Sequence, residues 1–280
     1  MPSIKRNQIA AMNIHWKLYP FEDFLKTQQQ LGVKTIEFWA TAPHFLVDEY
    51  GYQENYREVR KMIEEQYGLK VGAFTPECAC FPYQIASWDK GLWERSIEYY
   101  KNGLECASLF GAKIEQITCC GGAWDQEPEY AFERAVEALR ILGPAAADNG
   151  VTLTVETVRP EESNVVTTLP ELKRLLKAVD HPNVKAAVDT CAMGVANETL
   201  EEWFDCLGSD IRHMHFIDGR PYGHLIWGEG LHPLDDYIET LNRNHYEGYL
   251  GQELTVVDYW FDPAQTDRKN MQAFAPYIKD

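Results

Sequence analysis

The feature that most constrains the fold is an alternation that runs the length of the chain. Eight short apolar runs rich in β-branched and aromatic residues recur, at residues 12–16, 35–40, 71–77, 113–119, 153–158, 184–189, 212–218 and 249–254. Between them lie amphipathic stretches with helical spacing, among them residues 21–32, 56–68, 93–111, 129–150, 169–180, 200–208 and 233–244. Several of these stretches end in glycine, a common stop signal for helices. The pattern predicts eight buried strands, each separated from the next by helix.

Eight strand–helix repeats in 280 residues fit a closed barrel of parallel strands, the (β/α)8 or TIM barrel. An open doubly wound sheet fits less well, because no Gly-x-Gly-x-x-Gly follows the first strand. The chain shows no low-complexity linker and no break in composition, so we predict a single domain over residues 1–280.

The charge of the chain narrows the classes of partner. The formal net charge is -17, which repels phosphate groups and disfavours nucleic acid and anionic membranes as partners. No apolar run reaches the length that spans a bilayer, and the first residues lack the apolar core of a signal peptide. These observations predict a cytoplasmic protein that acts on a small molecule.

Four charged or imidazole side chains lie near the ends of the last four apolar runs: Glu156, Asp189, His215 and Glu253. A carboxylate inside an apolar strand is costly unless a partner charge or a metal ion compensates it. Any one of these residues alone would be read as a salt-bridged or solvated group. Four at matching positions predict one shared divalent-metal site, because the chemistry of such barrels collects where the strands end.

The predicted ligand set is rich in oxygen. Three carboxylates and one imidazole suit Mn²⁺, or alternatively Mg²⁺ or Co²⁺, better than a structural zinc ion, which prefers thiolates. Such an ion polarises a carbonyl group and acidifies the neighbouring C–H. Two glutamates at the same site could then remove and return a proton, so the pattern predicts isomerisation of a sugar.

Several segments give the chain a resemblance to a known family. They are VETVRPEESNVV, VDTCAMG, IRHMHFID, IWGEG and YEGYLGQEL, with FTPECACFPY and IEFWATAPHF upstream. Together they resemble the xylose-isomerase-like sugar isomerase/epimerase superfamily, and within it the fructoselysine and ketose 3-epimerases. The resemblance implies that Glu156, Asp189, His215 and Glu253 bind the metal. It also implies that Glu156 and Glu253 form the acid/base pair.

Further residues are predicted to contact the substrate. The resemblance implies this role for Glu162 and, as an approximate counterpart of a family arginine, for Arg220. It also gives His44, in the segment APHF, as a candidate. From their positions in the sequence, we add a carboxylate of the second strand and two tryptophans in loops expected at the barrel mouth: Glu37, Trp124 and Trp227. Two alternatives stay open: Glu37 could instead orient a metal ligand, and an exposed loop tryptophan could instead serve a subunit interface. The family's substrate-binding histidine, three positions after the metal aspartate, is replaced by Ala192.

Three alternatives to the epimerase share parts of this pattern. A lyase could use the same metal site to eliminate a group from a 3-keto-glycoside or to dehydrate an inosose. A DNA-repair endonuclease of the same fold would need a basic groove, which the net charge of -17 opposes. A non-catalytic sugar sensor would not need the four metal residues. By resemblance we expect a homo-oligomer, or a complex with a smaller second subunit if the lyase interpretation holds.

Overall fold

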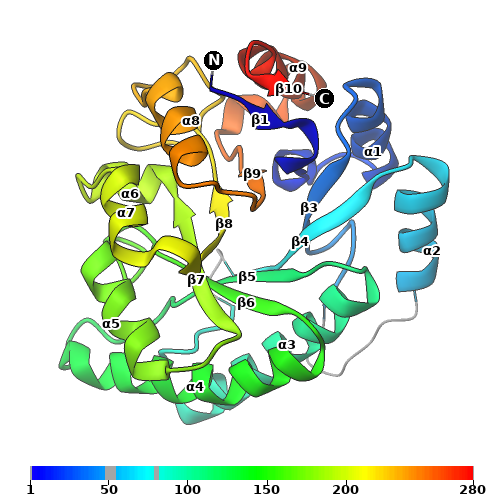
Figure 1. The fold of residues 1–280 in the computed structure, drawn as a ribbon. Helices are drawn as coiled ribbons and strands as arrows, with labels where there is room; N and C mark the ends of the chain where they lie inside the picture. Colours follow the sequence, from blue (N-terminus) through cyan, green and yellow to red (C-terminus); the bar gives the residue numbers. More distant parts are fainter. Residues whose placement is uncertain (1, 48–54, 79–81, 280) are drawn as a thin grey trace.

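The computed structural model describes residues 2–47, 55–78 and 82–279 and shows a closed barrel of eight parallel strands surrounded by helices (Figure 1). The strands neighbour one another in chain order: β2 (Ile9–Met12), β3 (Thr35–Ala40), β4 (Lys70–Pro76), β5 (Ile114–Thr118), β6 (Thr152–Glu156), β7 (Val184–Asp189), β8 (Ile211–His215) and β9 (Leu250–Gln252). This arrangement confirms the predicted (β/α)8 TIM barrel.

The helices that cover the barrel follow the predicted amphipathic stretches. They are α1 (Phe21–Gln30), α2 (Tyr56–Lys61), α3 (Lys90–Leu109), α4 (Pro128–Asp148), α5 (Leu169–Val179), α6 (Thr190–Val195), α7 (Leu200–Leu207), α8 (Leu234–Arg243) and α9 (Pro263–Phe274). Local sequence sets some of their starts: Thr168 precedes α5 and donates its backbone N–H to Glu171 at 3.0 Å, which forms a capping box. Among the described residues, no helix combines the length and apolarity that a bilayer-spanning segment needs.

Side chains alternate between the two faces of each strand, and this alternation separates core from site. Phe38 on β3 and Phe74 on β4 pack outward against Phe110, which follows α3, with ring centroids 5.2 and 5.8 Å from it. Their neighbours Glu37 and Thr75 point into the barrel and hydrogen bond to each other at 2.7 Å. The apolar layer under the helices therefore holds in place the strands that carry polar groups inward.

The first strand lies earlier than predicted. The sequence pattern placed it at residues 12–16, but β2 ends at Met12, and Ile14–Trp16 form a short 3-10 helix, η2. The cause is tertiary: His15 Nε2 and Trp16 Nε1 each lie 2.9 Å from the carboxylate of Asp267 on α9. These buried side chains turn toward a helix near the other end of the chain, which no local pattern reveals.

A second, smaller sheet lies at the end of the barrel opposite the residues predicted to bind metal. It pairs β1 (Ile4–Lys5) with β10 (Ile278–Lys279) in parallel, so the two ends of the chain lie side by side (Figure 1). Because β1 precedes the first barrel strand, this sheet marks the amino end of the barrel strands. The residues predicted to bind metal lie at their carboxyl end.

Candidate metal centre and active site

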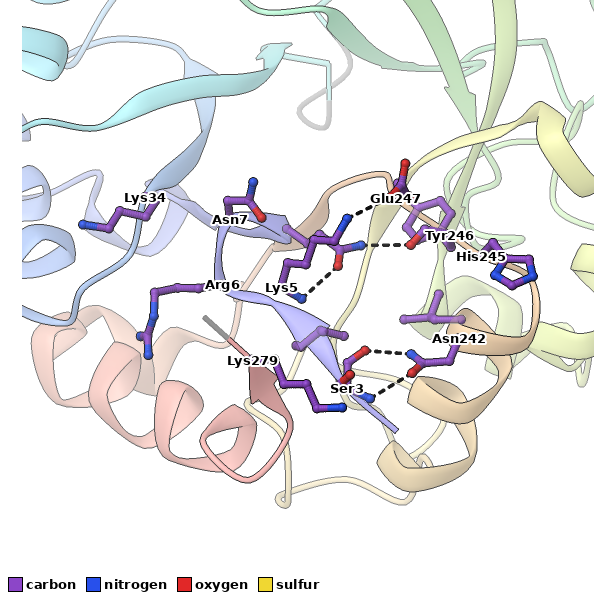
Figure 2. A pocket seen from close by; sticks show the side chains of 13 residues that line it. Ser3, Lys5, Arg6, Asn7, Lys34, Asn242, His245, Tyr246, Glu247 and Lys279 are labelled. Atoms are coloured by element: carbon purple, nitrogen blue, oxygen red, sulfur yellow. Dashed lines mark hydrogen bonds and ion pairs between the residues drawn. The ribbon is translucent and has the colours of Figure 1, made fainter. Parts of the chain in front are cut away.

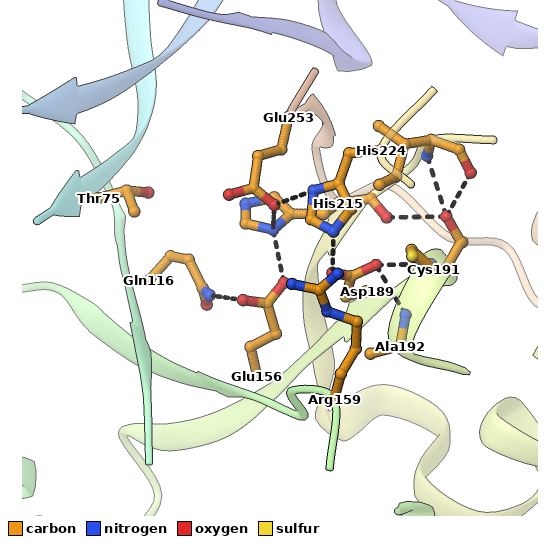
Figure 3. Close-up of polar contacts among 12 residues, drawn as sticks. Thr75, Gln116, Glu156, Arg159, Asp189, Cys191, Ala192, His215, His224 and Glu253 are labelled. Carbon is orange, nitrogen blue, oxygen red and sulfur yellow. Dashed lines mark hydrogen bonds and ion pairs between the residues drawn. The ribbon is translucent and has the colours of Figure 1, made fainter. Parts of the chain in front are cut away.

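Four side chains converge at the carboxyl end of the barrel (Figure 3). Glu156, Asp189 and His215 are the last residues of β6, β7 and β8, and Glu253 directly follows β9. Each offers one ligand atom, and these four atoms lie within 4.8 Å of one another. Parallel strands of a barrel end at one rim, so residues far apart in the sequence meet there. The structure therefore brings together the four residues that the sequence predicts to converge.

The ring of His215 is oriented from behind by a buried carboxylate. His215 Nε2 lies 2.9 Å from one oxygen of Glu37, and His213 Nε2 lies 3.0 Å from the other. Burial alone would raise the pKa of Glu37, but the two imidazoles outweigh it and hold that pKa well below its ordinary value. Glu37 is therefore an ionised acceptor. A neutral His215 that donates Nε2–H to it carries its lone pair on Nδ1, the atom that faces the other ligands.

The contacts around His215 Nδ1 test whether a cation fits. This atom lies 2.5 Å from Glu156 Oε1 and 3.1 Å from Glu253 Oε2. Both His215 Nδ1 and Glu156 Oε1 are buried, yet neither has a hydrogen-bond partner. Buried polar atoms nearly always have one, so a buried nitrogen and a buried oxygen that lie this close together without one fit a position for a positive ion. The three carboxylates and the imidazole suit a hard or intermediate divalent ion.

The two glutamates of the centre differ in their electrostatic surroundings. Burial raises the pKa of Glu156 to about 8, although His215 opposes this shift. Gln116 donates its side-chain amide to the second oxygen of Glu156 at 2.8 Å. Burial also acts to raise the pKa of Glu253, but contacts with His215 and His224 outweigh burial and lower it below its ordinary value. The two carboxyl groups of the centre therefore have opposite pKa shifts in the metal-free protein.

His224 is a residue of this centre that sequence analysis missed. Its Nδ1 lies 2.9 Å from Glu253 Oε2 and its Nε2 lies 3.3 Å from Asp189 Oδ2 (Figure 3). It belongs to a glycine- and proline-rich loop after β8, where no strand or helix period marks an inward position. The only available signal was a histidine a few residues beyond a predicted metal ligand.

Glu162 lies where the resemblance predicts a substrate contact. It lines a cavity of about 50 Å³ together with the four converging residues and His224. Arg159 holds it through two bonds, Nε to Oε2 at 3.0 Å and Nη2 to Oε1 at 2.6 Å. The carboxylate therefore has a fixed orientation at the edge of the cavity, and its contact with a substrate stays a prediction.

Two predicted substrate contacts are buried away from the cavity. Glu37 is fully buried and its oxygens are occupied by His213, His215 and Thr75, so it orients His215. The ring nitrogens of His44 lie 2.8 Å from Asn13 Nδ2 and 2.9 Å from the Tyr19 carbonyl oxygen. The polar atoms of both side chains form hydrogen bonds inside the protein, so their contact with a substrate stays a prediction to which the structure adds no support.

Three residues of the mouth loops also lie away from the cavity, and their predicted substrate contacts stay predictions. Trp227 is buried in the core, where its indole N–H donates to the Phe216 carbonyl oxygen at 3.1 Å. Trp124 is 69% exposed, and Arg220 is exposed as well. None of the three lines the cavity that contains the four converging residues, so this structure gives none of them a contact there.

Comparison with known proteins identifies the family. A family model described as xylose isomerase-like TIM barrel matches residues 25–276, so the chain belongs to that family. The resemblance seen in the sequence motifs is thereby confirmed.

Curated relatives in this family are sugar epimerases. The chain is 28% identical over 263 residues to the fructoselysine 3-epimerase of Escherichia coli O157:H7, covering 93% of this chain and 94% of that protein. It is 31% identical over 122 residues to the D-psicose 3-epimerase of Ruminiclostridium cellulolyticum, covering 44% and 41% of the two chains. These relationships support the conclusion that the chain is an enzyme of the sugar epimerase and isomerase class.

A solved structure shows the same fold at lower identity. The 3-keto-D-glucoside 4-epimerase of E. coli superimposes with a TM-score of 0.80 at 17% identity, covering 96% of this chain and 99% of that one. At this identity the likeness supports the fold alone, and the chemistry of the site has to be argued from the residues themselves.

Proposed function

We propose that the protein is a divalent-metal-dependent epimerase that inverts a carbon next to the carbonyl group of a ketose or a keto-sugar derivative. The observation that carries the proposal is the convergence of Glu156, Asp189, His215 and Glu253 within 4.8 Å, with buried ligand atoms that lack hydrogen-bond partners. These four residues would hold the ion, which we expect to be Mn²⁺. When bound, the ion would supply a Lewis acid that makes the C–H next to the carbonyl more acidic.

Glu156 and Glu253 are the groups that would move the proton. They approach His215 Nδ1 from β6 and from the residue after β9, so their carboxyl groups flank the centre from two strands. One carboxylate takes the proton from the carbon, which leaves an enediolate. The other, as a carboxylic acid, returns a proton to the opposite face of the same carbon, and the configuration is inverted.

The surroundings of the two glutamates favour this exchange. Gln116 fixes one oxygen of Glu156, while His224 contacts one oxygen of Glu253. Glu162 lines the cavity, where its carboxylate would accept a hydrogen bond from a substrate hydroxyl. The family relatives extend the substrate class to free ketoses and to ketoses with an amino-acid substituent, since those relatives are named for D-psicose and fructoselysine.

The test is metal analysis of the purified protein followed by solvent exchange. The Mn²⁺-loaded protein is incubated in D₂O with D-fructose, D-psicose, D-tagatose and fructoselysine, and NMR reports deuterium at the carbon next to the carbonyl. We expect one deuterium per turnover and a new epimer. A protein that binds no divalent ion, or that exchanges hydrogen in none of the four sugars, would contradict the proposal.

Adding a 3-keto-glycoside to the same experiment separates epimerisation from the lyase alternative. A lyase would consume a 3-keto-glycoside and release its aglycone or an unsaturated product. An aromatic aglycone would be expected to contact tryptophans, and neither Trp124 nor Trp227 lines the cavity. The proposal also retains a homo-oligomer in the cytoplasm, which light scattering and cell fractionation would test.

A further inference from the structure

We infer that His224 binds the substrate directly, donating a ring N–H to a substrate oxygen beside Glu253. This inference rests on the proposed function and adds to it a residue that recognises an oxygen of the reacting sugar. In this role His224 would stabilise the negative charge that forms on that oxygen in the enediolate, after the carbon has lost its proton.

The position of His224 is the first support. The side chain lies on the cavity side of the metal centre, in contact with Asp189 and Glu253 and outside the set of four converging ligand atoms. With Asp189 and Cys191 it forms another group of ligand atoms within 4.8 Å of one another, so Mn²⁺ affinity is one of the readouts of the test below. Its residue is 9% exposed, and it lines the cavity that Glu162 also lines. A sugar that enters the cavity next to Glu253 therefore meets this ring.

The second support is an unpartnered atom. His224 Nδ1 is buried and has no hydrogen-bond partner, even though Glu253 Oε2 is 2.9 Å away. The approach lacks the geometry of a hydrogen bond. A substrate oxygen that arrives beside Glu253 would replace this ion-pair contact of Nδ1 and would not have to break a formed hydrogen bond.

Charge is the third support. Four carboxylates line the cavity, and no lysine or arginine occurs among the lining residues that the structure describes. His215 is already engaged with Glu37 through Nε2 and faces Glu156 through Nδ1. The two ion-pair partners of His224 are carboxylates of the metal centre, Asp189 and Glu253. We therefore assign to this imidazole the contact with a substrate oxygen of negative character, in a cavity where a further anion would otherwise be repelled.

The loop that carries His224 is rigidly organised by Asp218. Its carboxylate accepts four backbone N–H groups at 2.7–3.0 Å, from residues 219, 228, 230 and 232. The backbones of Asp218 and Leu225 exchange two hydrogen bonds, at 3.0 and 2.9 Å. His224 directly precedes Leu225, so hydrogen bonds fix the backbone next to it. A substrate-binding side chain requires such a rigid support.

The experiment uses the variants His224→Ala and His224→Gln with three readouts. Mn²⁺ affinity is measured by electron paramagnetic resonance, and binding of D-psicose and of fructoselysine to the Mn²⁺-loaded protein by calorimetry. Deuterium exchange with the same sugars gives kcat and KM. The matched control is His245→Asn, which changes an exposed histidine at the other end of the barrel. Asparagine suits its positive φ of 51°.

We expect His224→Ala to keep Mn²⁺ affinity within about 3-fold while sugar binding weakens about 10-fold and kcat falls about 10²-fold, as for the loss of one donor to a developing oxyanion. His224→Gln, whose amide can still donate, should recover part of the sugar affinity. Unchanged sugar binding in His224→Ala would overturn the inference. So would a loss of Mn²⁺ affinity with normal sugar binding, because His224 would then serve the metal.

The two proposals can fail separately. If the wild-type protein binds either sugar but exchanges no hydrogen, the epimerase proposal fails, while calorimetry still decides the role of His224. If the wild-type protein binds neither sugar, the inference about His224 fails as well. A normal exchange rate in both His224 variants, with epimerisation intact, would leave the proposed function standing and remove His224 from it.

Discussion

The two ends of the barrel both carry a hollow, and they differ in size and in chemistry. The hollow at the amino end measures about 780 Å³, and residues of β1, α8 and β10 are among those that line it (Figure 2). The cavity at the carboxyl end measures about 50 Å³. Volume alone would favour the amino end, so the difference between them has to be sought in the state of the polar groups.

At the amino end the polar groups are solvated and satisfied. Lys5 and Glu247 form an ion pair at 2.8 Å with side chains 63% and 77% exposed, and Ser3 exchanges two hydrogen bonds with Asn242 (Figure 2). At the carboxyl end the carboxylates and imidazoles are buried, and some of their atoms lack partners. Burying a charge is costly and a solvated pair costs little, so the smaller cavity is the one built for chemistry.

The sharpest test of this comparison is Glu253→Gln, which removes one proton-transferring group from the small cavity. We expect deuterium exchange to fall by about 10²–10⁴-fold, the usual contribution of a general acid or base. The matched control is Glu247→Gln, the same chemical change at the amino end, which should leave the exchange rate unchanged. Full activity in Glu253→Gln would break the comparison.

A second test asks whether the buried layer beneath the centre matters. Glu37→Gln keeps the shape of the side chain but removes the charge that orients His215 through Nε2. We expect Mn²⁺ affinity to fall by about 10–100-fold, as for other groups that orient a metal-binding histidine. Calorimetry with Mn²⁺ measures this, with Glu94→Gln on the exposed face of α3 as control. Equal affinities would show that Glu37 is only a packing residue.

A carboxyl group buried away from both ends sharpens the comparison further. Glu115 on β5 is fully buried between the barrel and α3, close to Gly103, and neither of its oxygens has a hydrogen-bond partner. Burial raises the pKa of Glu115 well above its ordinary value. It therefore stays protonated in the folded protein at pH values where the unfolded chain ionises it.

The consequence is a loss of stability as the pH rises. Above the ordinary carboxyl pKa the unfolded state releases the Glu115 proton and is favoured, until the pH passes the raised pKa of the folded state. Glu115→Gln removes this effect and should raise Tm more at pH 8 than at pH 5, with a difference of at least about 2–4 °C. Thermal unfolding at both pH values measures it. The same shift at both would show that ionisation of Glu115 is not involved.

The smallest effect is expected at the amino end. Lys5→Ala breaks the exposed pair with Glu247 and should change Tm by less than about 1 °C, since such pairs contribute little in water. Neither Mn²⁺ affinity nor deuterium exchange should change. A clear loss of Mn²⁺ affinity or of deuterium exchange would show that the amino end affects the metal centre, and it would contradict the functional separation of the two ends.

Much of this architecture could be predicted from the sequence because its signals are periodic. Strands such as 35–40 and 184–189 have short apolar runs, and helices such as α5 carry capping residues, so their positions follow from neighbouring residues. Glu156, Asp189, His215 and Glu253 stood out because a charged residue in an apolar run has to be compensated. Where the signal came from the tertiary structure, as at residues 12–16, the prediction was wrong.

The barrel, the order of its strands and the kind of ligand atoms at its carboxyl end could be predicted from the sequence alone, because apolar period and buried charge are local properties. Only the tertiary structure decided which other polar side chains join them. His224 reaches the centre from a loop, whereas the side chains of Glu37, His44 and Trp227 form hydrogen bonds with other groups of the protein. Those choices depend on which groups from distant segments lie within hydrogen-bonding distance, and no spacing along one segment contains that information.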